Sequence, residues 1–209
     1  MPRRLQRGVG PRMSRGPVPR HRRFDPRRVG GLECTAWVSY YRRQWPRFLT
    51  AAVGLTRHTF GLPWPQTLQG AWLVLRANQA WAPYPHNDPD SARRLMERFY
   101  ALVKERHAET YDPGSAAALE VEWWRVHRAR QREGTEDEHA LEEALASLYG
   151  YVYGVPKDDV RPAARQRALA MDISDRWVQQ GCRSDSPLVG AERAALVRSY
   201  AALLAAVHL

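Results

Sequence analysis

The chain has 209 residues, of which 44% are hydrophobic and 26% charged, and its formal net charge is +10. This length supports one good hydrophobic core, and the composition is that of an ordinary globular protein. No stretch approaches the roughly 18 apolar residues of a membrane span, so we expect no membrane partner. The two cysteines, Cys34 and Cys182, lie far apart and in no metal-binding spacing. A reducing, cytoplasmic location is therefore expected.

The positive charge is concentrated at the N-terminus. Residues 1–33 hold ten arginines and two acidic residues, a net charge of +8, whereas the rest of the chain carries only +2. Residues 1–31 combine Arg with Gly and Pro and have almost no apolar periodicity, which predicts a disordered basic arm before an all-helical domain over 32–209. Such an arm suits contact with nucleic acid or another polyanion. The alternative is an idle tail, or a translation start at Met13.

The N-terminal half of the domain has helical spacing throughout. Apolar residues recur at this spacing over 35–60, where Pro46 predicts a kink or a break. Residues 65–81 are apolar around nearly the whole circumference of a helix, which predicts that this helix is buried near the centre of the domain. Asp88 and Asp112 each precede a proline and are typical N-caps of the two helices that follow.

The C-terminal half contains three further predicted helices. Residues 135–138 form a capping box for a helix that ends at Gly154. The helix after it spans about 158–181, and Ser186 followed by Pro187 opens the last one. No alternating strand pattern of useful length is present. The sequence therefore predicts an all-α protein with a single bundle-like domain of six or seven helices.

One stretch, residues 120–127, combines a carboxylate and an imidazole with two tryptophans. At 100° per residue, Glu120 and His127 fall within an apolar arc, whereas Glu122 points outward. A carboxylate in a core must be paired or protonated. The two residues are therefore either a structural polar pair or part of a functional site. The arc that surrounds them is formed by Leu119, Trp123, Trp124 and Val126.

The predicted buried helix over 65–81 also carries polar residues. A buried Arg76 needs a carboxylate or several carbonyl groups, and Glu120 is one candidate partner. The alternative is that Arg76 extends outward along its aliphatic stem. The candidate catalytic residues are accordingly Arg76, Gln79, Glu120 and His127.

Two acidic motifs match metal-ligand spacings. Glu136-x-x-His139 has the spacing of ferritin-like di-iron proteins, but both residues point away from the apolar arc of their helix. Asp172-x-x-Asp175 lies in a stripe of mixed charge, which predicts a solvated face with pairing of Asp172 and Arg176. We therefore predict no metal site.

The run Trp124-Arg-Val-His127, followed by Gly154-Val155-Pro156 and Val160-Arg-Pro162, resembles the C-terminal half of the MpaB-type oxygenases. The resemblance covers about a fifth of the chain. It implies a helical, haem-linked protein, in which His107 and His127 are the positions for a haem ligand.

Two functions follow from the sequence. The first is a non-catalytic interaction protein whose basic arm contacts an acidic partner or nucleic acid. The alternative is a small helical oxidoreductase or ligand-binding protein, with haem or iron near Glu120 and His127. The first is favoured, because no set of residues in the sequence completes a catalytic site. The sequence also has no Gly-rich phosphate loop, no Cys-x-x-Cys and no Gly-x-Ser-x-Gly, so nucleotide-binding, zinc-binding and hydrolase functions lack support.

Overall fold

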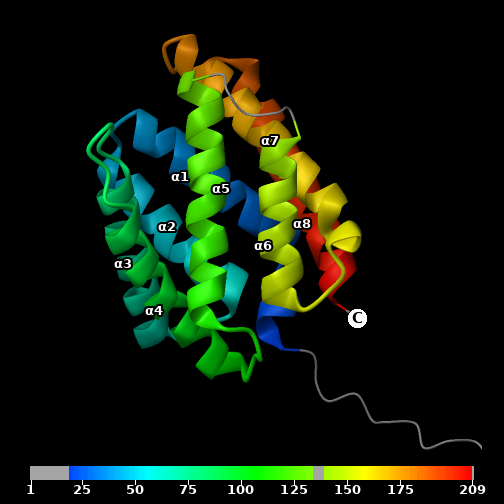
Figure 1. The fold of residues 1–209 in the computed structure, drawn as a ribbon. Coiled ribbons are helices and arrows are strands. Elements are labelled where there is room, and N and C mark those ends of the chain that lie inside the picture. The colour runs from blue at the N-terminus through cyan, green and yellow to red at the C-terminus, as the bar shows by residue number, and fades with distance from the viewer. Residues whose placement is uncertain (1–18, 134–138, 209) are drawn as a thin grey trace, which may run out of the picture.

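The computed structural model describes residues 19–133 and 139–208 (Figure 1). In this part of the chain all regular structure is helical, with one 3-10 turn, eight α-helices and no strand. The all-α prediction is confirmed, and the predicted number of helices is slightly too small. The elements are η1 (Arg20–Arg22), α1 (Pro26–Tyr41), α2 (Trp45–Phe60), α3 (Trp64–Trp81), α4 (Pro89–His107), α5 (Pro113–Glu133), α6 (Ala140–Tyr153), α7 (Lys157–Gln179) and α8 (Pro187–Val207).

Of the kink or break expected at Pro46, the structure has the break, which separates two helices. Helix α1 ends at Tyr41, and Arg43 takes a left-handed conformation with φ of 56°. Pro46 then occupies the first turn of α2, where its missing N–H group is not needed. The break adds a helix to the predicted number.

The N-terminal boundary of the domain also differs from the prediction. Asp25 caps α1 by accepting hydrogen bonds from the backbone N–H groups of Arg27 at 2.9 Å and Arg28 at 3.4 Å. Phe24 and Val29 are buried in the core. The predicted disorder of 1–31 is therefore wrong for residues 19–31, where the arginines alternate with core residues, and residues 1–18 lie outside the described part.

Other predicted helix ends are confirmed. The Asp88 side chain accepts a hydrogen bond from Ser91 N at 2.8 Å, and the Ser186 hydroxyl accepts one from Leu188 N at 3.3 Å. Gly154 ends α6 in the left-handed conformation that glycine favours. The capping box over 135–138 lies outside the described residues, and the described part of α6 begins after His139.

Each helix packs against the next one in the chain, and α8 packs against α1, so the order of neighbours closes on itself. The Nδ1 atom of His208 hydrogen-bonds to the backbone oxygen of Arg22 at 3.0 Å, which ties α8 to η1. Figure 1 shows α5 and α6 in front, with α3 and α4 at one side and α7 and α8 at the other. No helix in the described residues is long and apolar enough to cross a membrane.

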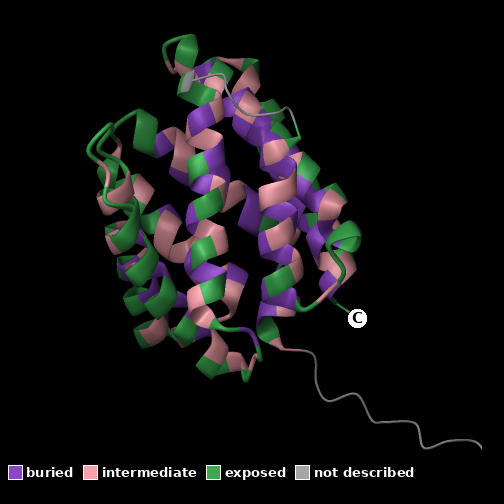
Figure 2. Ribbon diagram, viewed as in Figure 1, coloured by how far each residue is buried: buried purple, intermediate pink, exposed green. Residues whose placement is uncertain are grey.

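Most of the core lies between α4, α5, α6, α7 and α8, and α3 contributes only Leu73 and Ala77 to its buried apolar side chains. Helix α7 contributes Trp177, which is fully buried. The buried positions of α2 and α3 are instead mostly small side chains, and the prediction that helix 65–81 is central is wrong (Figure 2). These positions are Ala51, Thr56, Thr59, Thr67, Gly70, Leu73 and Ala77.

Candidate functional site

Two aromatic side chains hydrogen-bond to Glu120, one from the next turn of α5 and one from α4. Tyr100 of α4 donates its hydroxyl to Glu120 Oε2 at 2.7 Å, and Trp124 donates its indole N–H to Oε1 at 3.2 Å. Burial raises the pKa of the Glu120 carboxyl, and these donated hydrogen bonds only partly oppose that rise. Glu120 points inward as predicted, but its partners are Tyr100 and Trp124 and not the expected Arg76 or His127. Glu122 is exposed as predicted and pairs with Arg125 at 2.9 Å.

Arg76 and Gln79 lie on the exposed side of α3, away from Glu120's partners. Arg76 Nη1 donates to Gln79 Oε1 at 3.0 Å, and its guanidinium lies 5.8 Å from the centre of the Trp72 ring. The expected Arg76–Glu120 pair is therefore not formed. The alternative, an outward arginine, describes the observed arrangement, because no residue of ranges 19–133 and 139–208 covers the outer side of α3 at Arg76.

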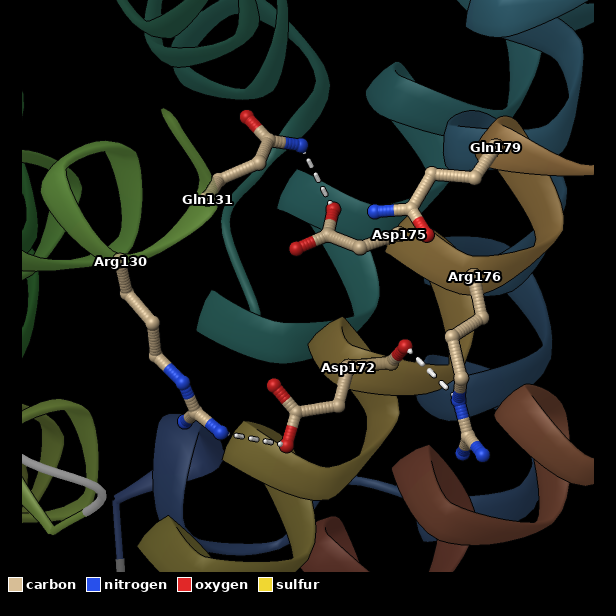
Figure 3. A pocket seen from close by; sticks show the side chains of 6 residues that line it. All are labelled: Arg130, Gln131, Asp172, Asp175, Arg176 and Gln179. Carbon is tan, nitrogen blue, oxygen red and sulfur yellow. Dashed lines mark hydrogen bonds and ion pairs between the residues drawn. The ribbon is translucent and has the colours of Figure 1, made fainter. Parts of the chain in front are cut away.

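His127 belongs to a second polar cluster, where α5 faces α7. Figure 3 shows the neighbouring side chains Arg130 and Gln131 of α5 opposite Asp172 and Asp175 of α7. His127 Nε2 lies 3.1 Å from Asp175 Oδ2, and Gln131 donates to Asp175 Oδ1 at 2.7 Å. Arg130 donates to Asp172 Oδ2 at 3.1 Å. These residues link the two helices across an open pocket of about 230 Å³ lined by Arg130, Gln131, Asp172, Asp175, Arg176 and Gln179.

The prediction for Asp172 and Asp175 is corrected by these contacts. The carboxylates pair across helices, whereas Arg176 only donates to the backbone oxygen of Asp172, at 3.3 Å. Burial raises the pKa of the Asp172 carboxyl, and Arg130 partly opposes the rise. The described residues contain no group of three or more metal-ligating side chains. Glu136 lies outside the described residues, and His139 is exposed at the start of α6.

His107 lies at the end of α4 in a third cluster. Its Nε2 atom hydrogen-bonds to the backbone oxygen of Phe60 at 2.7 Å, and its ring lies 4.3 Å from that of His21. Burial lowers the pKa of the His107 imidazole. His127 is 14 residues along α5 from Pro113, a rise of about 21 Å, so the two histidines sit at different levels of the bundle. The structure does not bring these two candidate haem ligands together.

Sequence reasoning missed a buried ionic cluster between α1, α7 and α8. Glu33 is 1% exposed, and Arg167 Nη2 lies 2.5 Å from its Oε1 atom. Tyr200 donates its hydroxyl to Glu33 Oε2 at 2.6 Å, and Arg167 contacts the same hydroxyl at 3.2 Å. Burial and the Glu33 carboxylate raise the pKa of Tyr200 well above its ordinary value. The cluster is a buried ion pair that joins three helices, and the Nε atom of Arg167 has no hydrogen-bond partner in the described part of the chain.

A further buried carboxyl, that of Glu192, lies beside this cluster. It is 0% exposed, and neither of its oxygens has a hydrogen-bond partner in the described part of the chain. Burial, followed by the charge of Glu33, raises the pKa of Glu192 to about 8. Helical spacing could have found this residue, because Glu192 precedes the buried Leu196 by one turn of α8.

The outer side of α3 carries a stripe of large apolar side chains. Trp64, Leu68 and Trp72, spaced by four residues, are 57%, 56% and 60% exposed. We call these three residues the α3 stripe. Arg57 of α2 covers the Trp64 ring at 4.1 Å, while Arg76 flanks the opposite end of the stripe beside Trp72. Exposed apolar patches of this kind mark interaction surfaces more often than isolated exposed residues do.

The chain has no match among known protein families, curated proteins or solved structures. The resemblance to MpaB-type oxygenases therefore stays a prediction. What can be inferred about function comes from the side chains themselves.

The α3 stripe lies within a long span of the chain that has no acidic residue. Between Glu33 and Asp88 there are five arginines, five tryptophans and neither Asp nor Glu. A second aromatic cluster, Tyr40, Tyr41, Trp45 and Phe48, falls in the same span, with ring centroids 5.3–6.3 Å apart. Helices α2 and α3 thus combine exposed aromatic side chains with uncompensated positive charge.

Proposed function

We propose that this chain is a non-catalytic interaction protein that binds an anionic partner, either a nucleic acid or an anionic lipid surface, through α2 and α3, assisted by the arginines of residues 1–18. The observation that supports the proposal is the span between Glu33 and Asp88, which has five arginines, no acidic residue and an exposed aromatic stripe. Aromatic residues and arginine are enriched where proteins bind partners. The proposal extends the role first inferred for the arm to a surface of the folded domain.

The oxidoreductase alternative has less support from the contacts. Glu120 bonds to Tyr100 and Trp124, His127 pairs with Asp175, and Arg76 bonds to Gln79, so the four candidates occupy three separate environments. A catalytic site requires its groups to converge on one reacting atom. The absorbance spectrum and metal content of freshly purified protein test this alternative directly, since a Soret band or stoichiometric iron would favour it.

A binding assay with three anionic probes tests the proposed function. The probes are vesicles that contain phosphatidylglycerol, a 20-nucleotide single strand and a 20-base-pair duplex. We expect the full chain to bind at least one of them at 0.1 M salt, more weakly at higher salt, because exposed charges are screened. The double substitution Arg57→Gln and Arg76→Gln should weaken binding. The control substitution Arg198→Gln, in α8, should not. If the full chain bound none of the three probes, the proposal would be refuted.

A further inference from the structure

The α3 stripe is left uncovered by the described part of the chain. A helix that is apolar around its whole circumference is normally buried on all sides. Here the inner side of α3 packs through Thr67, Gly70, Leu73 and Ala77, while the bulkier Trp and Leu side chains face outward. Small residues between helices and large apolar residues outside are the arrangement that lipid-facing helices use.

We propose that the α3 stripe lies on the surface of an anionic lipid bilayer, an inference that rests on the proposed function and specifies its partner. Trp64 and Trp72 would sit at the headgroup level, where amphipathic indole rings concentrate. Leu68, which lies between them, would reach the boundary of the acyl chains. Arg57 and Arg76, next to the two indoles, would pair with lipid phosphates. A contact on one leaflet is distinct from a membrane span, whose absence led to the expectation of no membrane partner.

Charge argues against a second copy of this chain as the occupant. A two-fold symmetric contact places the same patch on both sides. Arg57 and Arg76 of one copy would then meet the same residues of the other, and neither α2 nor α3 contains a carboxylate to compensate them. Residues 1–18 are equally unsuited, because they contain five arginines and no acidic residue.

The side chains also favour a bilayer over a nucleic acid. Single-stranded nucleic acids bind by stacking bases on open aromatic faces. The guanidinium of Arg57 lies over the Trp64 ring at 4.1 Å, so that face is occupied. Leu68 has no ring on which a base could stack. Each side chain of the α3 stripe is more than half exposed, and a fluid bilayer can surround such projecting groups without preformed pockets.

Co-sedimentation of the full chain with lipid vesicles tests the proposal. We expect partitioning onto vesicles of three parts phosphatidylcholine to one part phosphatidylglycerol to exceed that onto pure phosphatidylcholine by about tenfold or more at 0.1 M salt. The double substitution Leu68→Gln and Trp72→Gln should lower this partitioning by about tenfold. Leu169→Gln, the same change at an exposed leucine of α7, is the matched control and should leave it unchanged.

Unfolding curves of each variant check that the fold is intact. If the double variant does not fold, the single variant Leu68→Gln replaces it in the co-sedimentation test. Equal partitioning of Leu68→Gln and Leu169→Gln would overturn the bilayer proposal. Binding to the oligonucleotides but not to vesicles would also overturn it, while the proposed function would stand. Concentration-dependent dimerisation that Leu68→Gln abolishes would overturn it in favour of a second copy. Binding to none of these probes would refute both proposals.

Discussion

The buried carboxyl group of Glu192 makes the stability of the folded state depend on pH. Its pKa is raised to about 8 in the fold, whereas an unfolded glutamate titrates near its ordinary value of 4.5. Between these values the native state holds a proton that the unfolded state has released. The contribution of Glu192 to the free energy of unfolding is therefore fully present below pH 4.5 and is lost as pH rises to 8, by at most about 1.4 kcal/mol per pH unit.

Replacing Glu192 with glutamine should remove this pH dependence. We expect the Glu192→Gln variant to gain stability relative to the parent chain as pH rises from 5 to 8, because its amide cannot ionise. Urea unfolding at pH 5, 6.5 and 8 measures the difference between the two curves. Glu122→Gln, at an exposed carboxylate, is the control and should run parallel to the parent. A Glu192→Gln curve that also runs parallel would contradict the raised pKa of the buried Glu192 carboxyl.

Glu120 presents a different case, because both of its oxygens accept hydrogen bonds. A glutamine there keeps one acceptor for Tyr100 but turns an N–H group toward the indole N–H of Trp124. An unsatisfied buried donor costs about 1–3 kcal/mol, so Glu120→Gln should lower the free energy of unfolding by that amount. Glu122→Gln loses only an exposed pair with Arg125, worth about 0–1 kcal/mol. Urea unfolding at pH 7 measures both variants. Equal losses in the free energy of unfolding would disprove the two buried hydrogen bonds assigned to Glu120.

At the scale of elements, the short N-terminal turn η1 and the start of α1 belong to the folded domain. Phe24 lies between them, is buried and packs edge-on against the ring of Tyr200, with centroids 5.8 Å apart. His21 Nε2 lies 2.7 Å from Glu109 Oε1, so η1 is also held to the end of α4. Together with Arg22, His21 lowers the pKa of the Glu109 carboxyl, although burial acts in the opposite direction.

Truncation of Phe24 tests this boundary of the domain. Phe24→Ala should reduce the free energy of unfolding by about 3–5 kcal/mol, the usual cost of removing a buried aromatic ring. Arg23→Ala, at the exposed neighbouring position, should have little effect. Thermal and urea unfolding measure both variants. Near-identical stability of the two would mean that the basic arm extends past residue 24, as the sequence had predicted.

Local signals predicted the helices well, because caps and helix breakers act within a few residues. Asp88, Ser186 and Gly154 all end or begin helices where their chemistry requires. The same spacing argument placed Glu120 on an inward face, but it carries no information about which helix lies opposite. It also assigned α3 to the core, because periodicity shows that a face is apolar and not whether this chain covers it. Partners 42 or 48 residues away, such as Asp172 for Arg130 and Asp175 for His127, depend on the tertiary fold.

At the scale of the whole molecule, the charge is divided between two parts of the sequence. The first 87 residues carry a net charge of +13, whereas residues 88–209 have 17 basic and 20 acidic side chains. The near-neutral total of residues 34–209 therefore conceals a positive part, which includes α2 and α3, and a slightly negative part. Under the proposed function, this charge distribution would turn α2 and α3 toward an anionic surface.

The basic N-terminal residues and the α3 stripe should contribute to binding in different ways. Under the proposed function, the five arginines in residues 1–18 would attract an anionic surface through their charge, which salt screens over a Debye length of about 10 Å at 0.1 M and about 3 Å at 1 M. The α3 stripe contributes apolar burial, which salt does not weaken. Deleting residues 1–18 should therefore reduce vesicle binding at 0.05 M salt and have little effect at about 0.5 M.

Leu68→Gln should show a different pattern, with the same proportional loss of vesicle partitioning at every salt concentration, because salt does not weaken the apolar contribution. Co-sedimentation with anionic vesicles over this range of salt concentration measures both variants against the parent chain. The combined variant should lose the two contributions additively in free energy, because the two groups do not share a partner. If the deletion and Leu68→Gln produced the same dependence on salt, the two contributions would not be separable, and binding would have to be assigned to charge alone.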